Sequence, residues 1–278
     1  MDERACKVLE YDKVIEMLKR YAGSELGRAR CAELKPQTDV KEIHRMQEET
    51  RDALARIYKK GSLSFYGLPD IRGALKLLEV GSSLLAVELL KISSVLTATQ
   101  RVKSYGGKIS EEQEADSLSE RFELLEPLQT LNNEIQRCIL SEEEIADDAS
   151  PGLKSVRRQM KIINDKIRDQ LNTIVNSQDS KTMLQDSIIT MRNGRYCLPV
   201  KQEYKGQFAG LIHDQSSKGS TIFMEPASVV KLNNELSELF LKEAKEIEKI
   251  LAELSAQAAM HTENLVYNTE TLTELEFN

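Results

Sequence analysis

Apolar residues recur at helical spacing through the first half of the chain. Between residues 9 and 34 they step by three or four positions, with a break at "GSELG". The same period predicts helices over about 39–59, with Thr38 or Asp39 as the cap, and over about 70–79, 84–105 and 111–125. We therefore expect residues 1–150 to form a helical core.

Two later stretches carry a narrow apolar seam on an otherwise polar surface, the pattern of a helix that pairs with one partner. Ser150 and Pro151 mark the start of the first, because a capping residue followed by proline favours helix initiation. A helix over 151–175 is about 37 Å long at 1.5 Å per residue. Together the seams predict an antiparallel pair of long helices. The first seam is Leu153, Val156, Met160, Ile163, Ile167, Leu171 and Ile174, and the second is Val229, Leu232, Leu236, Leu239, Ala244, Ile247, Leu251, Leu254 and Ala258.

The segment between the seams has the alternation and turns of strands. Asn193-Gly194 lies between "SIITM" and "YCLPV", and Asn-Gly between strand-like runs is a strong hairpin signal. "FAGLIHD" and "STIFM", joined through "QSSKG", predict a second strand pair, and Pro199 favours an edge position for its strand. The predicted order is a helical core (1–150), an outgoing helix (151–186), a small antiparallel sheet (187–225), and a returning helix with a final piece (226–278).

Composition narrows the class of protein. Charged residues make up 30% of the chain and aromatic residues 5%, which suits long exposed helices better than a compact α/β enzyme. The four cysteines are scattered without CxxC spacing, so we expect free thiols and a cytoplasmic location. The N-terminus lacks the apolar core of a signal peptide, and no apolar run is long enough for a membrane span.

The stretch "HDQSSKGSTIFMEP" (213–226) raises the question of catalysis. In Lys218-Gly219-Ser220-Thr221 the lysine precedes the glycine and a strand follows, whereas a Walker loop needs glycine before lysine and a helix after it. The near match "YGGKIS" (105–110) also lacks the upstream glycine. His213 and Asp214 are neighbours on a predicted strand, so their side chains should point to opposite faces and form no relay. The three histidines have no metal-ligand spacing.

The charge is unevenly distributed. The chain carries −7 overall, but residues 154–218 contain twelve lysines and arginines against six acids, a local balance of +6 that leaves −13 elsewhere. Such a segment can hold phosphates without reading bases. The alternative is the solvated face of a coiled coil, where lysine and arginine are common.

Several long motifs resemble one protein family. "RNGRYCLPVKQEYKGQFAGLIHDQSSKGSTIFMEPASVVKLNNELSEL" (192–239) is similar to the lever and clamp region of the second MutS paralogue of bacteria. "LEYDKVIEMLKRYAGSELGR" (9–28), "GLPDIR" (67–72) and "DASPGLKSVRRQM" (148–160) agree. The resemblance implies a mainly α fold, with a helical core, long antiparallel lever helices and a small antiparallel β clamp at their tip.

The resemblance also implies function. Members of the family are ATPase homodimers that close around nucleic acid, and the full-length protein adds an ATPase using ATP and Mg and, usually, a small nuclease-like domain. No Walker sequence precedes Asn278, so we expect this chain to be neither ATPase nor endonuclease and to need no cofactor. The implied partner is branched DNA, with a role in suppressing recombination. The alternatives are ribosomal RNA, in the rescue of collided ribosomes, or no nucleic acid at all for a mechanical or dimerising coiled-coil arm.

We predict that cations of the outgoing helix and the clamp contact phosphates. The candidates are Arg157, Arg158, Lys161, Arg192, Arg195, Lys201, Lys205 and Lys218.

Overall fold

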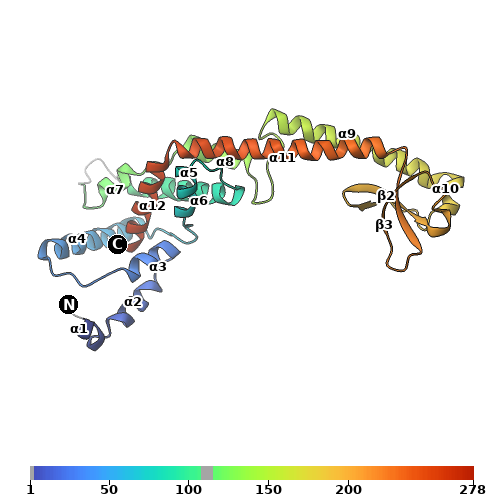
Figure 1. Cartoon of the computed structure of the whole chain (residues 1–278). Helices are drawn as coiled ribbons and strands as arrows, with labels where there is room; N and C mark the ends of the chain where they lie inside the picture. The colour runs from blue at the N-terminus through green and yellow to red at the C-terminus, as the bar shows by residue number, and fades with distance from the viewer. Residues whose placement is uncertain (1–2, 108–114) are drawn as a thin grey trace. The chain divides into compact units, whose positions relative to one another are not determined.

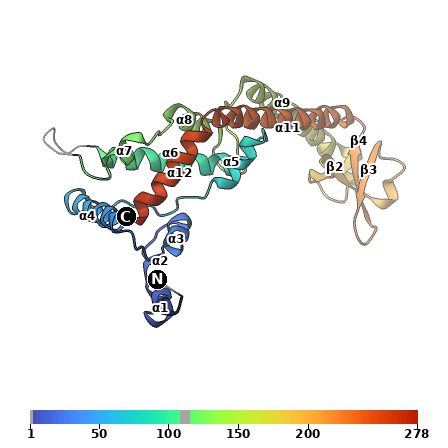
Figure 2. The same ribbon diagram turned by 60° about the vertical axis from the view of Figure 1, so that its left-hand side comes forward.

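The structure is a computed structural model that describes residues 3–107 and 115–278 (Figures 1 and 2). The chain separates into two compact units. Residues 1–146 with 251–278 form one, which we call the helical unit, and residues 147–250 form the other, the helix–sheet unit. The fold is mainly α with one small antiparallel sheet, as the sequence predicts.

The helical unit confirms the first four predicted helical regions. Asp39, rather than Thr38, caps α4, since its carboxylate accepts the amide of Lys41. The region predicted as 111–125 is helical only over α7, and part of it lies outside the described residues. The helices are α1 (Glu3–Val8), α2 (Tyr11–Lys19), α3 (Glu25–Ala32), α4 (Val40–Lys60), α5 (Arg72–Glu79), α6 (Ala86–Gly106), α7 (Ser119–Leu124), α8 (Gln129–Cys138), and α12 (Thr262–Phe277).

Helix α6 is the centre of the helical unit, with α7, α8 and α12 packed around it. Leu89, Ile92, Val95 and Leu96 are fully buried, so apolar side chains cover more than one face of this helix. A helix that is apolar on several sides is stable only inside a core. The hydrophobic effect of this burial, at about 25 cal/mol per Å² of apolar surface, holds the surrounding helices together.

The helix–sheet unit is built on a helix pair. Helix α9 (Pro151–Asn176) lies beside α11 (Val230–Ala259), part of which belongs to this unit (Figures 1 and 2). Ser150 caps α9 by accepting the amide of Leu153, and proline occupies the first turn, as predicted. The outgoing helix is interrupted at Ser177, whose hydroxyl accepts the amide of Ser180 and so starts α10 (Gln178–Met183).

The predicted apolar seams are correct except at one point. Leu153, Ile167 and Leu171 of α9 are fully buried, and Leu236 and Leu239 of α11 are buried as well. Ala244, predicted in the second seam, is exposed. Glu243 and Glu246 contact α9 instead, through Arg157 and Ser150. The contact between the two helices is therefore apolar near the sheet, and near the start of α9 it combines the buried Leu153 with these polar contacts.

The sheet has four antiparallel strands in the order β1-β2-β4-β3. They are β1 (Thr190–Arg192), β2 (Arg195–Lys201), β3 (Gly210–Gln215) and β4 (Thr221–Pro226), with a short 3-10 helix, η1 (Gln202–Tyr204), after β2. Asn193 and Gly194 both have positive φ and close the predicted hairpin. Leu198, Val200, Ile222 and Met224 turn one face of the sheet onto the buried ends of α9 and α11.

The expected edge position of Pro199 is wrong. Strand β2 lies between β1 and β4, so it is an interior strand. The proline is tolerated because β1 pairs only as far as Cys197. Beside Pro199 the neighbouring segment supplies the amide of Gln185, which donates to the proline carbonyl oxygen at 2.9 Å. No ladder bond is lost there, because β1 no longer runs alongside.

Candidate nucleic-acid interface

Helix α9 carries a row of cations on the side away from its apolar seam. Lys154, Arg158, Lys161 and Arg168 follow at steps of four, three and seven residues, which places them on one face of a helix. All four are exposed, and none of their side chains forms a hydrogen bond or ion pair with any residue that the structure describes. At 1.5 Å per residue the row extends over about 21 Å. Asp165 interrupts it.

Arg157 is adjacent in sequence but differs in role. Its Nε donates to Glu243 of α11 at 2.7 Å, and its Nη1 contacts Asp147 at 2.5 Å. One residue of helix is a rotation of about 100°, which is enough to turn Arg157 toward α11 while Arg158 faces solvent. Arg157 therefore links α9 to α11 through its ion pair with Glu243.

Two free lysines lie on neighbouring loops of the sheet. The amide of Gln202 donates to the carbonyl oxygen of Ser220 at 3.1 Å, which brings the loop after β2 beside the turn between β3 and β4. Lys205 and Lys218 are exposed on these loops, without a side-chain partner in the described part of the chain. Lys201 has a hydrogen-bond partner, since its ammonium donates to the carbonyl oxygen of Thr182 at 2.8 Å.

Side chains of the β1–β2 hairpin contact β3 and β4 on the face of the sheet opposite the buried apolar residues Leu198, Val200, Ile222 and Met224. The guanidinium of Arg192 stacks on the ring of Phe223 in β4, 3.9 Å from its centroid. Its Nε lies 3.2 Å from the carboxylate of Asp214 in β3. The side-chain amide of Asn193 donates to the carbonyl oxygen of His213 at 3.0 Å. Residues of β1 and its turn thus contact both β4 and β3.

Beneath the hairpin lies a buried carboxylate. Glu225 is 0% exposed. It accepts from Arg195 at 3.1 Å and Asn233 at 2.7 Å, and its other oxygen lies 2.6 Å from Nε2 of His213. Asn233 also bonds the backbone amide and carbonyl of Tyr196, both at 3.3 Å, beyond the point where the pairing of β2 with β4 ends. An uncompensated buried carboxylate would be costly, so these donors explain why the charge is tolerated.

The eight predicted residues therefore divide into two groups. Arg158, Lys161, Lys205 and Lys218 are free and exposed, whereas Arg157, Arg192, Arg195 and Lys201 have partners among the residues that the structure describes. The sequence prediction omitted Lys154 and Arg168, although their spacing from Arg158 was visible. It also missed Glu225 and Asn233. A glutamate in the apolar run "STIFMEP" was a signal, but nothing marked Asn233.

The structure offers no support for catalysis by the stretch 213–226. His213 contacts Glu225, Asp214 pairs with Arg192, and the hydroxyl of Ser216 accepts the amide of Thr221. These three side chains thus serve separate contacts. His213 sits at a bulge between Ile212 and Asp214, which is why simple strand alternation does not describe it.

The nucleotide loop considered at residues 218–221 lacks the geometry that a Walker loop needs. Residues 218–221 join two strands, so no helix N-terminus is available for a phosphate there. "YGGKIS" lies partly outside the described residues. Over residues 3–107 and 115–278, no cluster of three or more His, Cys, Asp or Glu side chains is arranged to hold a metal ion. Over the same residues, no helix has the length and apolarity needed to cross a bilayer.

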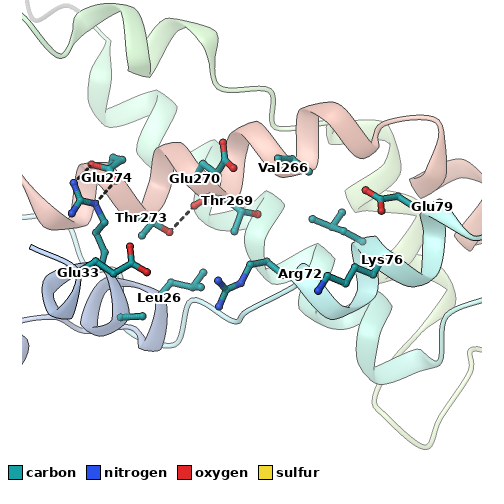
Figure 3. A pocket seen from close by; sticks show the side chains of 13 residues that line it. Leu26, Glu33, Arg72, Lys76, Glu79, Val266, Thr269, Glu270, Thr273 and Glu274 are labelled. Carbon is teal, nitrogen blue, oxygen red and sulfur yellow. Dashed lines mark hydrogen bonds and ion pairs between the residues drawn. The ribbon is translucent and has the colours of Figure 1, made fainter.

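The helical unit has a groove of about 590 Å³ between α3, α5 and α12 (Figure 3). Leu26, Leu75 and Val266 are among its apolar lining residues. Arg30 at its rim is paired with Glu274, and Arg72 is paired with Asp70 outside it. Because its rim carries both signs of charge, the groove does not resemble a phosphate site.

Comparison with the sequences of known proteins places this chain in a family. The chain is 62% identical over 282 residues to endonuclease MutS2 of Lachnoclostridium phytofermentans, a match covering 100% of this chain and 35% of that protein. It is 50% identical to endonuclease MutS2 of Agathobacter rectalis and 44% identical to that of Ruminiclostridium cellulolyticum, with the same coverage. A scan against models of protein families gave no match. The chain belongs to the endonuclease MutS2 family and spans about a third of the length of these relatives.

Proposed function

We propose that the helix–sheet unit is the lever and clamp of a MutS-like ATPase and contacts the backbone phosphates of branched DNA without reading base sequence. The observation that carries the proposal is the set of free cations on one row of α9 and on two adjacent loops of the sheet. Lysine and arginine on phosphates release counterions, which supplies affinity but no sequence preference.

The names of the relatives support a nucleic-acid ligand. They are called endonucleases, a class of enzyme that acts on nucleic acid. For the full-length protein we propose that ATP and Mg binding and any nuclease activity belong to other regions, and that a homodimer closes around DNA. The role that follows is suppression of recombination through contact with DNA branches.

Salt dependence tests the proposal. The 278-residue chain is titrated into a fluorescent four-way DNA junction over a series of KCl concentrations, beside the triple variant R158E/K161E/K218E. None of these three side chains has a partner in the described structure, so the variant should fold normally. We expect weaker binding and a log–log salt slope flatter by about 0.9 for each phosphate that the variant no longer neutralises.

A charge-matched control is available in the helical unit. Lys41, Lys59 and Lys76 are exposed, and their side chains are likewise unpaired among the described residues, so K41E/K59E/K76E changes the net charge equally. Equal weakening by both triple variants would mean that only net charge matters, and the absence of any salt-dependent binding would support a mechanical arm. A ribosomal RNA stem of matched length, bound more tightly than the junction, would favour the ribosomal alternative.

A further inference from the structure

Arg192 is held in place by contacts other than its ion pair. Its guanidinium lies on the ring of Phe223, and its Nη1 donates to the carbonyl oxygen of Met191 at 3.0 Å. The turn that follows is anchored by Asn193 on the carbonyl oxygen of His213. An arginine stacked on an aromatic ring loses little further freedom when it binds an anion. The cation is therefore preorganised with or without a carboxylate beside it.

Asp214 is an exchangeable partner of this cation. Its side chain is 48% exposed and that of Arg192 is 36% exposed, and Nε of Arg192 lies 3.2 Å from Oδ2 of Asp214. The other carboxylate oxygen accepts the amide of Gln215 at 2.8 Å, which fixes the aspartate at the rim of the sheet. An ion pair this exposed contributes little stability, because water competes for both partners.

The other arginine of the hairpin shows the contrast. Arg195 is 24% exposed, and its partner Glu225 is completely buried among several donors. An external anion cannot replace that carboxylate without leaving a buried charge unpaired. Of the two arginines on this hairpin, Arg192 is thus the one that combines a fixed guanidinium with a displaceable counter-ion.

We infer that Arg192 is a preformed phosphate-binding residue and that Asp214 occupies it as an internal competitor until a nucleic-acid phosphate displaces it. The inference rests on the proposed function and assigns Asp214 and Phe223 a part in it. Asp214 lowers affinity for any single phosphate, so that firm binding requires the free cations of α9 and the loops to engage as well. The consequence is selection for ligands that present many phosphates at once.

The test compares D214N, R192Q and D214N/R192Q with the unchanged chain on the same four-way DNA junction. Removal of the competitor should tighten binding roughly two- to fivefold, the range expected for an exposed ion pair. Neutralising one further phosphate should steepen the salt slope by about 0.9. The double variant should bind no more tightly than R192Q, since the benefit of D214N passes through Arg192.

A second aspartate controls for charge alone. Asp169 is exposed on α9 and has no cationic partner within the described residues, so D169N removes the same charge elsewhere in the unit. Equal tightening by D169N and D214N, or tightening that survives in D214N/R192Q, would overturn the inference. So would unchanged affinity in D214N when the parent chain binds with a clear salt slope, a result that leaves the proposed function standing. Absence of any salt-dependent binding by the parent chain would overturn both.

Discussion

Each unit encloses a buried charge that side chains from distant segments hold in place: a cation, Arg56, in the helical unit, and an anion, Glu225, in the helix–sheet unit. The helical unit also buries Glu49. Arg56 is 5% exposed, donates to Asp116 at 2.6 and 2.7 Å, and lies over the ring of Phe122. Glu225, fully buried, receives donors from β2, β3 and α11. In both units a buried charge fixes segments distant in sequence, because leaving it unpaired would be costly.

The surfaces of the two units differ more than their interiors. Arginines of the helical unit, such as Arg30, Arg45 and Arg72, are matched with nearby carboxylates. On α9 the row of Lys154, Arg158, Lys161 and Arg168 is unmatched among the described residues. Paired surface charges neutralise one another, whereas unpaired ones remain available to a ligand. The helical unit also exposes unpaired lysines such as Lys41 and Lys59, so what favours the helix–sheet unit in our proposal is the regular row that its free cations form along one helix.

The largest expected effect comes from removing either buried charge. Arg56→Leu leaves Asp116 without its arginine, and Glu225→Leu removes the carboxylate that Arg195, His213 and Asn233 contact. Breaking a buried pair costs about 3–5 kcal/mol of unfolding free energy. Peptide-resolved hydrogen exchange should show the loss of protection in the unit that carries each substitution. Equal loss in both units from either substitution would contradict the separate roles.

Acid should weaken the Arg56 contact. Burial alone would raise the pKa of Asp116, but hydrogen bonds from Arg56 and Ser119 outweigh it and hold the pKa below its ordinary value. The stabilisation is therefore present above the ordinary pKa of aspartate, about 3.9, and is lost as pH falls toward the lowered value. Urea unfolding of the parent chain and of Arg56→Leu should converge at low pH. A gap that stays constant would be inconsistent with this pair.

Gly210 and Gly27 are both too close to other atoms to take a Cβ, but the atoms they face differ in how easily they can move. A Cβ at position 210 would collide with the carbonyl oxygen of Glu225 and approach the Cα of Pro226, both backbone atoms. A Cβ at position 27 would meet the carboxylate of Glu276, the end of a flexible side chain. Gly210→Ala should cost about 2–3 kcal/mol, as overpacking does, and Gly27→Ala less. Thermal unfolding of the two variants measures the difference, and the reverse order would refute it.

Substituting the paired Arg157 and the exposed Arg158 of α9 separates a structural role from a binding role. Arg157→Ala removes contacts with Glu243 and Asp147, whereas Arg158→Ala removes none that the structure describes. We expect Arg157→Ala to lower the free energy of unfolding by about 1 kcal/mol and Arg158→Ala to change it by less than about 0.5 kcal/mol. In junction binding the ranking should invert, with Arg158→Ala the weaker binder. A binding loss confined to Arg157→Ala would contradict the assignment.

The smallest effect concerns thiol reactivity. Burial, with the nearby charge of Glu225, raises the pKa of Cys197 to about 11, and burial also raises the pKa of Cys31. Both should react slowly with a maleimide at about pH 8, and Cys6, which is only partly buried, should react fastest. Glu225→Gln should accelerate labelling of Cys197 but not of Cys31, because the loosened cluster belongs to the helix–sheet unit. Peptide mass spectrometry separates the sites, and equal acceleration at both would count against the comparison.

Local patterns in the sequence determined the elements and their order. Helical periodicity, the Ser150-Pro151 start and the Asn193-Gly194 turn are properties of short segments, and the structure confirms each. The resemblance to the MutS paralogue family was equally readable, because its motifs are long. What lies within about one helical turn or one hairpin can be inferred without coordinates.

Tertiary structure alone decided which charges are free. Arg157 and Arg158 are adjacent residues of the same type. Arg157 contacts Glu243, 86 residues away in the sequence, whereas the side chain of Arg158 is exposed to solvent. The same holds for Arg192 with Asp214, Arg195 with Glu225, and the polar end of the second seam. The reason is physical: periodicity is a property of one segment, but the pairing of a charge depends on the side chain that a distant segment places within about 3 Å of it.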